Sequence, residues 1–143
     1  MQVRRLRLQD HEAMLELWRR AGLSSLRPRG RDRREVFAQQ LASGVETFLG
    51  LVEGDRLVGA VVATHDGRKG WINRLAVDPE YRRRGLARRL LAAAEQVLRE
   101  QGMTVIAVLV ERDSEASLRL FQREGYVLAR DVFYLSKRDD ADA

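Results

Sequence analysis

The sequence of 143 residues contains no cysteine. Disulfide bonds, a thiolate zinc site and a cysteine nucleophile are therefore excluded. No apolar run approaches the roughly 18–20 residues that a membrane-spanning helix needs. The first residues, MQVRRLRLQDHEAM, lack both the apolar stretch and the small-residue cleavage site of a secretory signal. We therefore expect a cytoplasmic protein that makes no use of a membrane.

Lysine is nearly absent as well. Lys69 and Lys137 are the only lysines among 26 basic residues, which leaves 24 arginines and a formal net charge of +5. Guanidinium groups pair bidentately with phosphate and carboxylate groups, so the composition favours anionic ligands. A genomic bias toward arginine codons is the alternative explanation. The charge alone does not choose between a phosphorylated small molecule and nucleic acid.

The length is enough for one hydrophobic core that needs no disulfide or metal. No internal repeat and no linker divides the chain. We therefore expect a single domain over residues 1–138 and a polar tail, DDADA, over residues 139–143.

The N-terminal part of the chain mixes strand and helix patterns. It predicts, in chain order, a strand over 2–8, a helix over 11–21, a loop over 23–31 and a helix over 32–42. Asp10 is a suitable N-cap for the first helix, and Asp32 with Glu35 forms a capping-box pattern at the second. The loop and second helix form either one wall of a substrate cleft or a solvated connector.

The middle of the chain predicts an antiparallel meander. Strands over 46–53, 56–64 and 71–77 are rich in branched and aromatic residues. The turn signals Gly54-Asp55 and Asp66-Gly67 separate them.

The C-terminal half predicts a helix with an apolar stripe over 86–101 and a strand, buried on both faces, over 104–110. With the strand over 71–77 they form a right-handed βαβ unit spanning 71–110, whose two strands are parallel. A helix over 114–124 follows, with Leu118 and Phe121 facing inward, and residues 126–136 read as a strand or hairpin.

Residues 75–91, LAVDPEYRRRGLARRLL, carry the strongest functional signal. They combine a strand end, a turn with one proline, an arginine-rich loop with one glycine, and the start of a helix. Unpaired backbone N–H groups and the helix dipole then meet at one point, where they favour an anion. We interpret this stretch as the pyrophosphate site of a cofactor, with a merely charged surface as the alternative.

Three short motifs of the chain resemble the motifs of one protein family. Arg82-Arg83-Arg84-Gly85-Leu86-Ala87 fits the signature Arg/Gln-x-x-Gly-x-Gly/Ala, Val77-Asp78-Pro79 precedes it, and Glu124-Gly125-Tyr126 closes the last helix. The chain thereby resembles the GNAT N-acetyltransferase superfamily, above all its small single-domain bacterial members of the YpeA type. The resemblance implies an acyl-CoA N-acyltransferase fold, a mixed α+β (α/β) sheet of about six to seven strands with about four helices. It also implies acetyl transfer from acetyl-CoA to a primary amine inside a ternary complex, with no metal.

The resemblance assigns most of the site to acetyl-CoA. Backbone groups of 75–77 would pair with the pantetheine arm and hold the thioester carbonyl. The N–H groups of 83–88 would wrap the pyrophosphate, where Gly85 and Ala87 allow a close approach. One or two arginine side chains would meet phosphates and the others would form a solvated face. The expected contacts are Leu75, Ala76, Val77, Arg82, Arg83, Arg84, Gly85, Leu86, Ala87, Arg88, Ser114, Ser117 and Phe121.

The catalytic positions depart from the family pattern. Ser117 conforms, but Ser114 lacks the amide of the usual asparagine, although it can still cap the helix. Phe121 replaces the tyrosine that can protonate the departing thiolate, a group that can also leave without a proton. Asn73 stands where many relatives carry a glutamate base. Glu111 is the best remaining carboxylate, as a base or as a surface acid, so Asn73 and Glu111 are the candidate catalytic residues.

Two other functions remain open at this point. The altered catalytic positions allow a non-catalytic module that binds or senses acyl-CoA. Nucleic-acid binding is the weaker alternative, because there is no RNA-type aromatic signature and the arginines surround a helix start. We therefore expect an amine acceptor, small molecule or protein, and no nucleic acid, in a monomer or homodimer.

Overall fold

A computed structural model describes residues 1–143 of the chain. Its helices and strands are, in chain order, β1 (Gln2–Arg5), the 3-10 turn η1 (Leu8–Asp10), α1 (His11–Arg20), α2 (Arg34–Ala42), β2 (Glu46–Glu53), β3 (Arg56–His65), β4 (Gly70–Val77), the 3-10 turn η2 (Pro79–Tyr81), α3 (Leu86–Glu100), β5 (Ile106–Val108) and α4 (Glu115–Arg123).

The strands form one mixed sheet in the order β1-β2-β3-β4-β5. Neighbouring strands from β1 to β4 are antiparallel, whereas β5 runs parallel to β4. The predicted meander and the βαβ unit with parallel strands are therefore confirmed. No helix of the chain is both long and apolar enough to cross a membrane.

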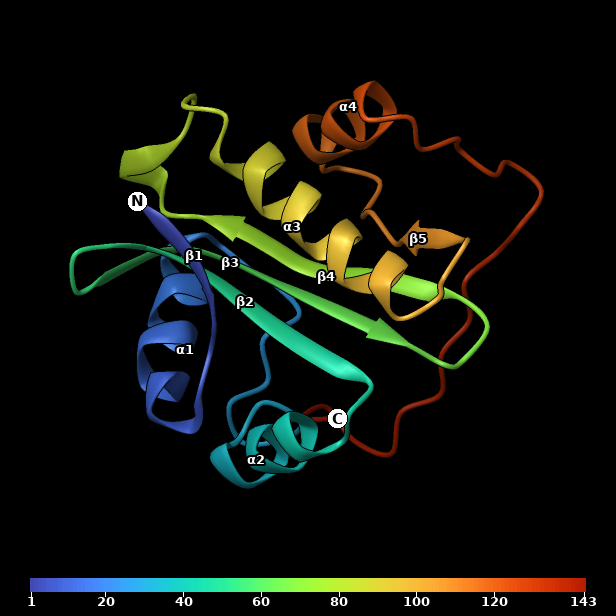
Figure 1. The fold of residues 1–143 in the computed structure, drawn as a ribbon. Coiled ribbons are helices and arrows are strands. Elements are labelled where there is room, and N and C mark those ends of the chain that lie inside the picture. Colours follow the sequence, from blue (N-terminus) through green and yellow to red (C-terminus); the bar gives the residue numbers. More distant parts are fainter.

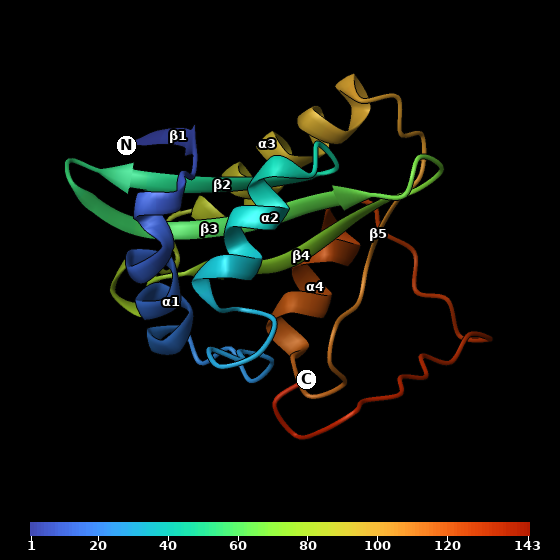
Figure 2. The same ribbon diagram turned by 90° about the horizontal axis from the view of Figure 1, so that it is seen from below.

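Helices cover both faces of the sheet. Helices α1 and α2 lie on one face, and α3 and α4 lie on the other (Figures 1 and 2). Each face has its own core, because the side chains of β2 and β3 alternate between the two sides. Trp18 and Phe37 are fully buried on the first side, and the apolar stripe of α3, including Leu90 and Leu98, is fully buried on the second.

Two glycines let α3 lie close against the sheet. A Cβ added at Gly59 of β3 would lie 2.7 Å from Leu90 Cδ1, and one added at Gly70 of β4 would lie 2.9 Å from Leu98 Cδ1. Interiors are packed too tightly to absorb such overlaps without a shift. The distance between α3 and the strands that carry the site thus depends on glycine at both positions.

The C-terminal side of the sheet differs from the prediction. Strand β5 spans only Ile106–Val108, and it is an edge strand instead of one buried on both faces. Val105 and Leu109 beside it are 49% and 58% exposed. Residues 126–143 form no strand, so the sheet has five strands and not six to seven. A bend at the charged pair Arg130-Asp131 divides the apolar residues of this segment into two short runs.

One predicted helix cap is confirmed in its position and the other is wrong. Asp10 is the N-cap residue of α1, as predicted, but its carboxylate accepts hydrogen bonds from Arg4 and from the Arg7 backbone N–H and makes no cap bond to the helix. Asp32 lies outside α2, whose N-cap residue is Arg33. In both places a guanidinium group from another element binds the carboxylate, and such charge-assisted hydrogen bonds are stronger than a neutral cap. Strand β1 ends at Arg5, short of the predicted end at residue 8, and beyond it the chain turns so that Asp10 lies beside Arg4.

We expect Gly59→Ala to lower the free energy of unfolding by about 1–3 kcal/mol, because the new methyl overlaps Leu90. The penalty should shrink in a Leu90→Ala background, which removes the overlapping Cδ1. Urea unfolding of the four proteins of this double-mutant cycle measures the coupling. Gly70→Ala is the control, since its overlap is with Leu98 and Leu90→Ala should not relieve it. Equal penalties for Gly59→Ala in both backgrounds would contradict the close packing of α3.

Candidate active site

The loop between β4 and α3 carries a set of backbone N–H groups without partners. No N–H group from Arg82 to Arg88 donates a hydrogen bond within the chain, and the first bonded one is that of Arg89, which donates to the Gly85 carbonyl at 3.2 Å. Arg83 and Gly85 adopt left-handed backbone conformations, with φ of 66° and 73°. The first turn of α3 contains no acidic residue. The loop therefore offers an anion a set of unpaired backbone dipoles.

A hollow of about 110 Å³ lies directly on this loop. Its walls are Val77, Tyr81, Arg82, Arg83, Gly85, Leu86 and Ala87. No atom lies within 4 Å of the position that a Cβ at Gly85 would occupy, so the glycine opens onto free space. A diphosphate group fits these features, because it needs several N–H donors and a backbone without a side chain in the way.

Asp78 fixes the start of the loop. Its side chain is 2% exposed and accepts hydrogen bonds from Arg20 of α1, Arg56 of β3 and the Glu80 backbone N–H. Burial alone would raise the pKa of Asp78, but the hydrogen bonds from Glu80, Arg56 and Arg20 outweigh it and hold the pKa below its ordinary value. The end of β4 is thereby tied to α1 and to the neighbouring strand β3.

The arginine side chains of the loop are mostly engaged elsewhere. Arg82 donates to the Ala21 carbonyl at 3.4 Å, Arg84 lies over the Tyr81 ring at 5.0 Å, and Arg88 pairs with Glu124 of α4 at 2.8 Å. Arg83 alone among the four has no ion pair, hydrogen bond or contact with an aromatic ring. The backbone therefore offers most of the donors for an anion, and Arg83 is the side chain free to add a charge.

Strands β4 and β5 part beside this loop. Pairing with β5 stops at Ile72, which lies opposite Val108, whereas β4 continues to Val77. On its other edge, β4 carries a bulge opposite Val61 of β3, and there Arg74 has a φ of 52°. The β4 edge from Asn73 to Val77 has no strand partner on the β5 side. An extended ligand chain can pair with such an edge as an added strand.

The two candidate catalytic residues lie at opposite sides of this parting. Asn73 is half-buried in β4, opposite Val62, and directly precedes the bulge. Glu111 is exposed beyond the end of β5 and accepts a hydrogen bond from the Ser24 hydroxyl at 3.0 Å. The loop after α1 therefore reaches across to Glu111, and it places this carboxylate at the mouth between the strands.

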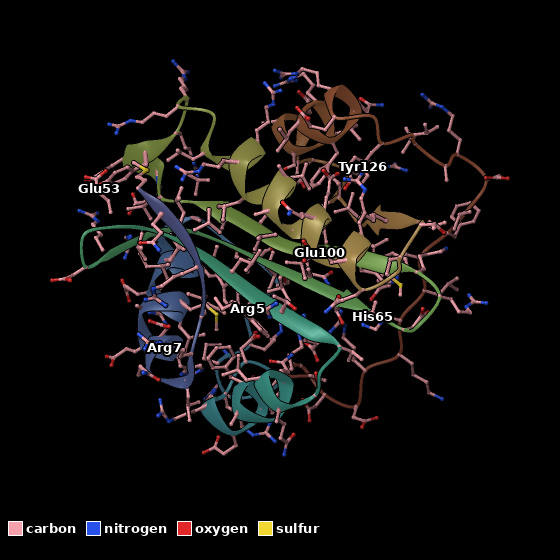
Figure 3. All side chains as sticks on the ribbon, in the orientation of Figure 1. Arg5, Arg7, Glu53, His65, Glu100 and Tyr126 are labelled. Carbon is pink, nitrogen blue, oxygen red and sulfur yellow. The ribbon has the colours of Figure 1, made fainter.

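The three predicted site residues at α4 differ in their burial and contacts. Ser114 stands at the N-cap position, but its hydroxyl makes no cap bond, and Ser117 is exposed. Phe121 is buried in the core, edge-on to the Tyr126 ring at 5.2 Å. The Tyr126 hydroxyl points to α3 and donates to the Glu95 carboxylate at 2.7 Å (Figure 3). Burial and this bond raise the pKa of Tyr126, so the hydroxyl keeps its proton.

The sequence did not reveal a second cluster beside the parting. Arg74 donates two hydrogen bonds to the Asp32 carboxylate and one to the Ser25 carbonyl, and its guanidinium lies 4.9 Å from the centre of the Trp18 ring. Asp32 also accepts from the Arg27 backbone N–H at 2.6 Å. Arg74 is far in the sequence from its partners, so no local sequence pattern predicts this cluster. The positive φ of Arg74 is a backbone feature that the sequence does not show either.

A larger hollow of about 360 Å³ lies elsewhere, between the end of β1 and α2. Its walls include Leu41 and Glu46, together with Arg5 and Arg7, which Figure 3 labels. The Arg5 guanidinium donates to the Thr47 hydroxyl at 3.5 Å, and no α-helix begins at this hollow. The smaller hollow has the unpaired donors and the helix start, so we assign the chemistry to the smaller one.

Comparison with known families agrees with this geometry. A model of the acetyltransferase (GNAT) family matches residues 11–126, which include the whole site. The fold class implied by the resemblance is therefore confirmed, while the likeness to the YpeA type stays an expectation.

Solved structures share the fold at low sequence identity. The PaiA N-acetyltransferase from Thermoplasma acidophilum, in complex with coenzyme A, is 20% identical, with a TM-score of 0.78 and coverage of 90% of each chain. AAC(6')-Iy, in complex with the bisubstrate analog CoA-S-monomethyl-acetylneamine, is 16% identical, with a TM-score of 0.79 and coverage of 96% of this chain and 97% of that one. The ribosomal-protein-S18-alanine N-acetyltransferase from Escherichia coli is 20% identical, with a TM-score of 0.73 and coverage of 87% and 76%.

We expect Gly85→Leu to lower the affinity for acetyl-CoA at least tenfold, about 1.4 kcal/mol or more, because the side chain enters the hollow. Gly102→Leu is the matched control. Gly102 also has a positive φ, 91°, and open space around it, but it lies beyond the far end of α3. Both variants should lose similar stability, and only Gly85→Leu should lose binding in calorimetric titration. Equal affinities of the two variants for acetyl-CoA would remove the loop as the cofactor site.

Proposed function

We propose, since the chain belongs to the acetyltransferase (GNAT) family, that it transfers an acetyl group from acetyl-CoA to a primary amine by direct attack inside a ternary complex. The observation that carries this proposal is the run of unpaired N–H groups from Arg82 to Arg88 beside the free edge of β4. The first feature suits a pyrophosphate and the second suits a pantetheine arm. Acetyl-CoA, when bound there, supplies the activated acetyl thioester.

The chain's own residues would act mainly by positioning. The free edge of β4 from Leu75 to Val77 would hold the pantetheine arm extended and direct an N–H group at the thioester oxygen, where negative charge develops. The acceptor nitrogen forms its bond to the acetyl carbon as the carbon–sulfur bond breaks. The sulfur leaves as the thiolate, and the amine proton passes to a base.

Glu111 is the carboxylate that we assign to this proton, through a water molecule. Ser24 donates to it at 3.0 Å, which holds the carboxylate toward the parting of β4 and β5. Asn73 in β4 accepts no proton, and its amide would orient the water or the amine. No hydroxyl replaces the family's tyrosine at position 121, since Phe121 lies in the core. The thiolate then leaves without a proton donor.

The neighbours support two parts of this proposal. Coenzyme A is bound in the Thermoplasma acidophilum structure. In AAC(6')-Iy the bisubstrate analog joins CoA to an acceptor-derived group, as a ternary complex would require. Asn73 and Phe121 favour the second candidate, an acyl-CoA-binding module without catalysis, and turnover distinguishes the two.

We expect one acetyl-CoA to bind per chain, and the binding to survive a rise in salt, because the N–H donors lie in a formed loop. Calorimetric titration with acetyl-CoA and with free CoA at two salt concentrations measures this. A panel of amines with detection of released CoA thiol then tests transfer. Absence of binding would refute the proposal, and binding without transfer to any amine would favour the non-catalytic module.

Glu111→Gln should lower kcat about 10²-fold, within the usual range for loss of a general base, and leave the affinity for acetyl-CoA unchanged. The pH profile gives the sharper readout. The activity of the variant should keep rising with pH until the acceptor amine itself is neutral, because no group of the enzyme then takes the proton. Asp113→Asn, two residues further along the chain, is the control and should keep wild-type kcat. Unchanged kcat in Glu111→Gln would exclude Glu111 as the base.

A further inference from the structure

The loop from Ser24 to Asp32 closes the parting of β4 and β5 on the side of α1 and α2. At one end Ser24 donates to Glu111 beyond β5, and at the other Asp32 binds Arg74 of β4. The pyrophosphate loop leads into α3, which covers the opposite face (Figures 1 and 2). An acceptor that approaches a thioester in the parting must therefore pass the loop 24–32.

This loop concentrates guanidinium groups with little compensating charge. It carries Arg27, Arg29 and Arg31, and its one carboxylate, Asp32, is already bound by Arg74. Partial burial and the charge of Arg74, with smaller contributions from Arg138 and Arg27, lower the pKa of Arg31. Asp32 opposes this shift only in part, so the positive charges around Arg31 outweigh the negative one, and an anion beside Arg31 would reduce their repulsion.

An acidic segment of the same chain lies on this loop. Residues 126–143 run around the β5 edge from α4 to the side of α2, in both views (Figures 1 and 2). Asp142 lies 3.7 Å from the Arg29 guanidinium, and its backbone carbonyl packs directly against Gly30. Asp139 and Asp140 belong to the same segment.

The contact is of a kind that a competing ligand displaces. Arg29 and Asp142 are 86% and 58% exposed, and exposed ion pairs contribute only about 0–1 kcal/mol. The groups that meet there are guanidinium and carboxylate, as in the pair that Asp32 of the loop makes with Arg74 of β4. The Arg74–Asp32 pair is mostly buried, whereas the Arg29 guanidinium holds its carboxylate loosely at the surface.

We propose that Arg29 and Arg31 bind a carboxylate of the acceptor, so that the substrate is an amine bearing carboxylate groups, and that the segment Asp139 to Asp142 occupies this subsite until such an acceptor displaces it. The inference rests on the proposed function and names the acceptor class. It assigns the acidic segment a role as a weak internal competitor.

The test uses two peptide probes with free N-termini, Ala-Glu-Glu-Gly and Ala-Gln-Gln-Gly, titrated into the full-length chain saturated with CoA. The acidic peptide should bind about tenfold more tightly, since two charge-assisted pairs replace two neutral contacts. Asp139→Asn/Asp140→Asn/Asp142→Asn should raise the affinity for the acidic peptide several-fold, because the competitor is lost. It should leave the affinity for the amide peptide unchanged.

Arg29→Gln/Arg31→Gln should abolish the preference for the acidic peptide. Arg68→Gln/Arg99→Gln removes the same charge from exposed positions away from the loop and is the matched control, which should keep the preference. Equal binding of the two peptides by the wild type, or equal behaviour of the two arginine variants, would overturn the inference. Binding of neither peptide would overturn it as well.

Failure of the inference and failure of the proposed function are distinguishable. Titration with acetyl-CoA and release of CoA thiol with an uncharged amine, on the same proteins, report on the proposed function alone. A chain that binds acetyl-CoA and acetylates the uncharged amine without a preference for the acidic peptide refutes only the carboxylate subsite. Free glutamate as a third probe shows whether the subsite needs a peptide or only a carboxylate beside an amine.

Discussion

Arg74 adopts a left-handed backbone conformation inside β4, and the rest of the site depends on how that conformation is held. For a residue with a side chain, such a conformation costs on the order of 1–3 kcal/mol and persists only where surroundings compensate. The compensation comes from the Asp32 carboxylate, the Ser25 carbonyl and the Trp18 ring. Since the bulge changes the course of β4, the strand leaves β5 after Ile72 and presents a free edge. The same guanidinium ties the loop 24–32 to that edge.

The two sides of the parting attract anions by different means. On the α3 side the attraction comes from backbone N–H groups, whose directions are fixed by the fold, and most arginine side chains there contact other parts of the protein. On the other side it comes from long side chains of a surface loop, whose charges are screened by salt. A fixed donor array suits a ligand that is always the same, such as a pyrophosphate. Flexible guanidinium groups suit a set of related acceptors.

The sequence predicted the elements whose patterns are local. The apolar stripe of α3 and the meander of β2 to β4 follow from local periodicity and turn residues, and the structure confirms both. The errors came where distant charges meet. The pattern predicts Asp32 as the cap of α2, because a cap needs only neighbours in sequence, but Asp32 binds Arg74 of β4 instead. Asp10 is the N-cap residue of α1 as predicted, yet its carboxylate binds Arg4 of β1 and makes no cap bond. The apolar run at β5 predicts a central strand. The sequence does not show that β5 lacks a strand neighbour on its outer side.

Helix α4 shows why an apolar ring at position 121 is compatible with this site. The helix is already fixed by the bond from Tyr126 to Glu95 and by the pair between Arg88 and Glu124, and Phe121 completes the packing between them. A thiol has a pKa of about 8.5, so its thiolate leaves near neutral pH without help. Removing a proton from the amine is harder, since the pKa is about 8 for an α-amino group and about 10.4 for a lysine side chain. At neutral pH roughly a tenth of α-amino groups are neutral, whereas far less than a hundredth of lysine side chains are. A site with one exposed carboxylate as its base therefore works best on an amine of low pKa. An α-amino group followed by acidic side chains has such a pKa, and it also carries the carboxylates that the arginine side chains of the loop 24–32 would bind.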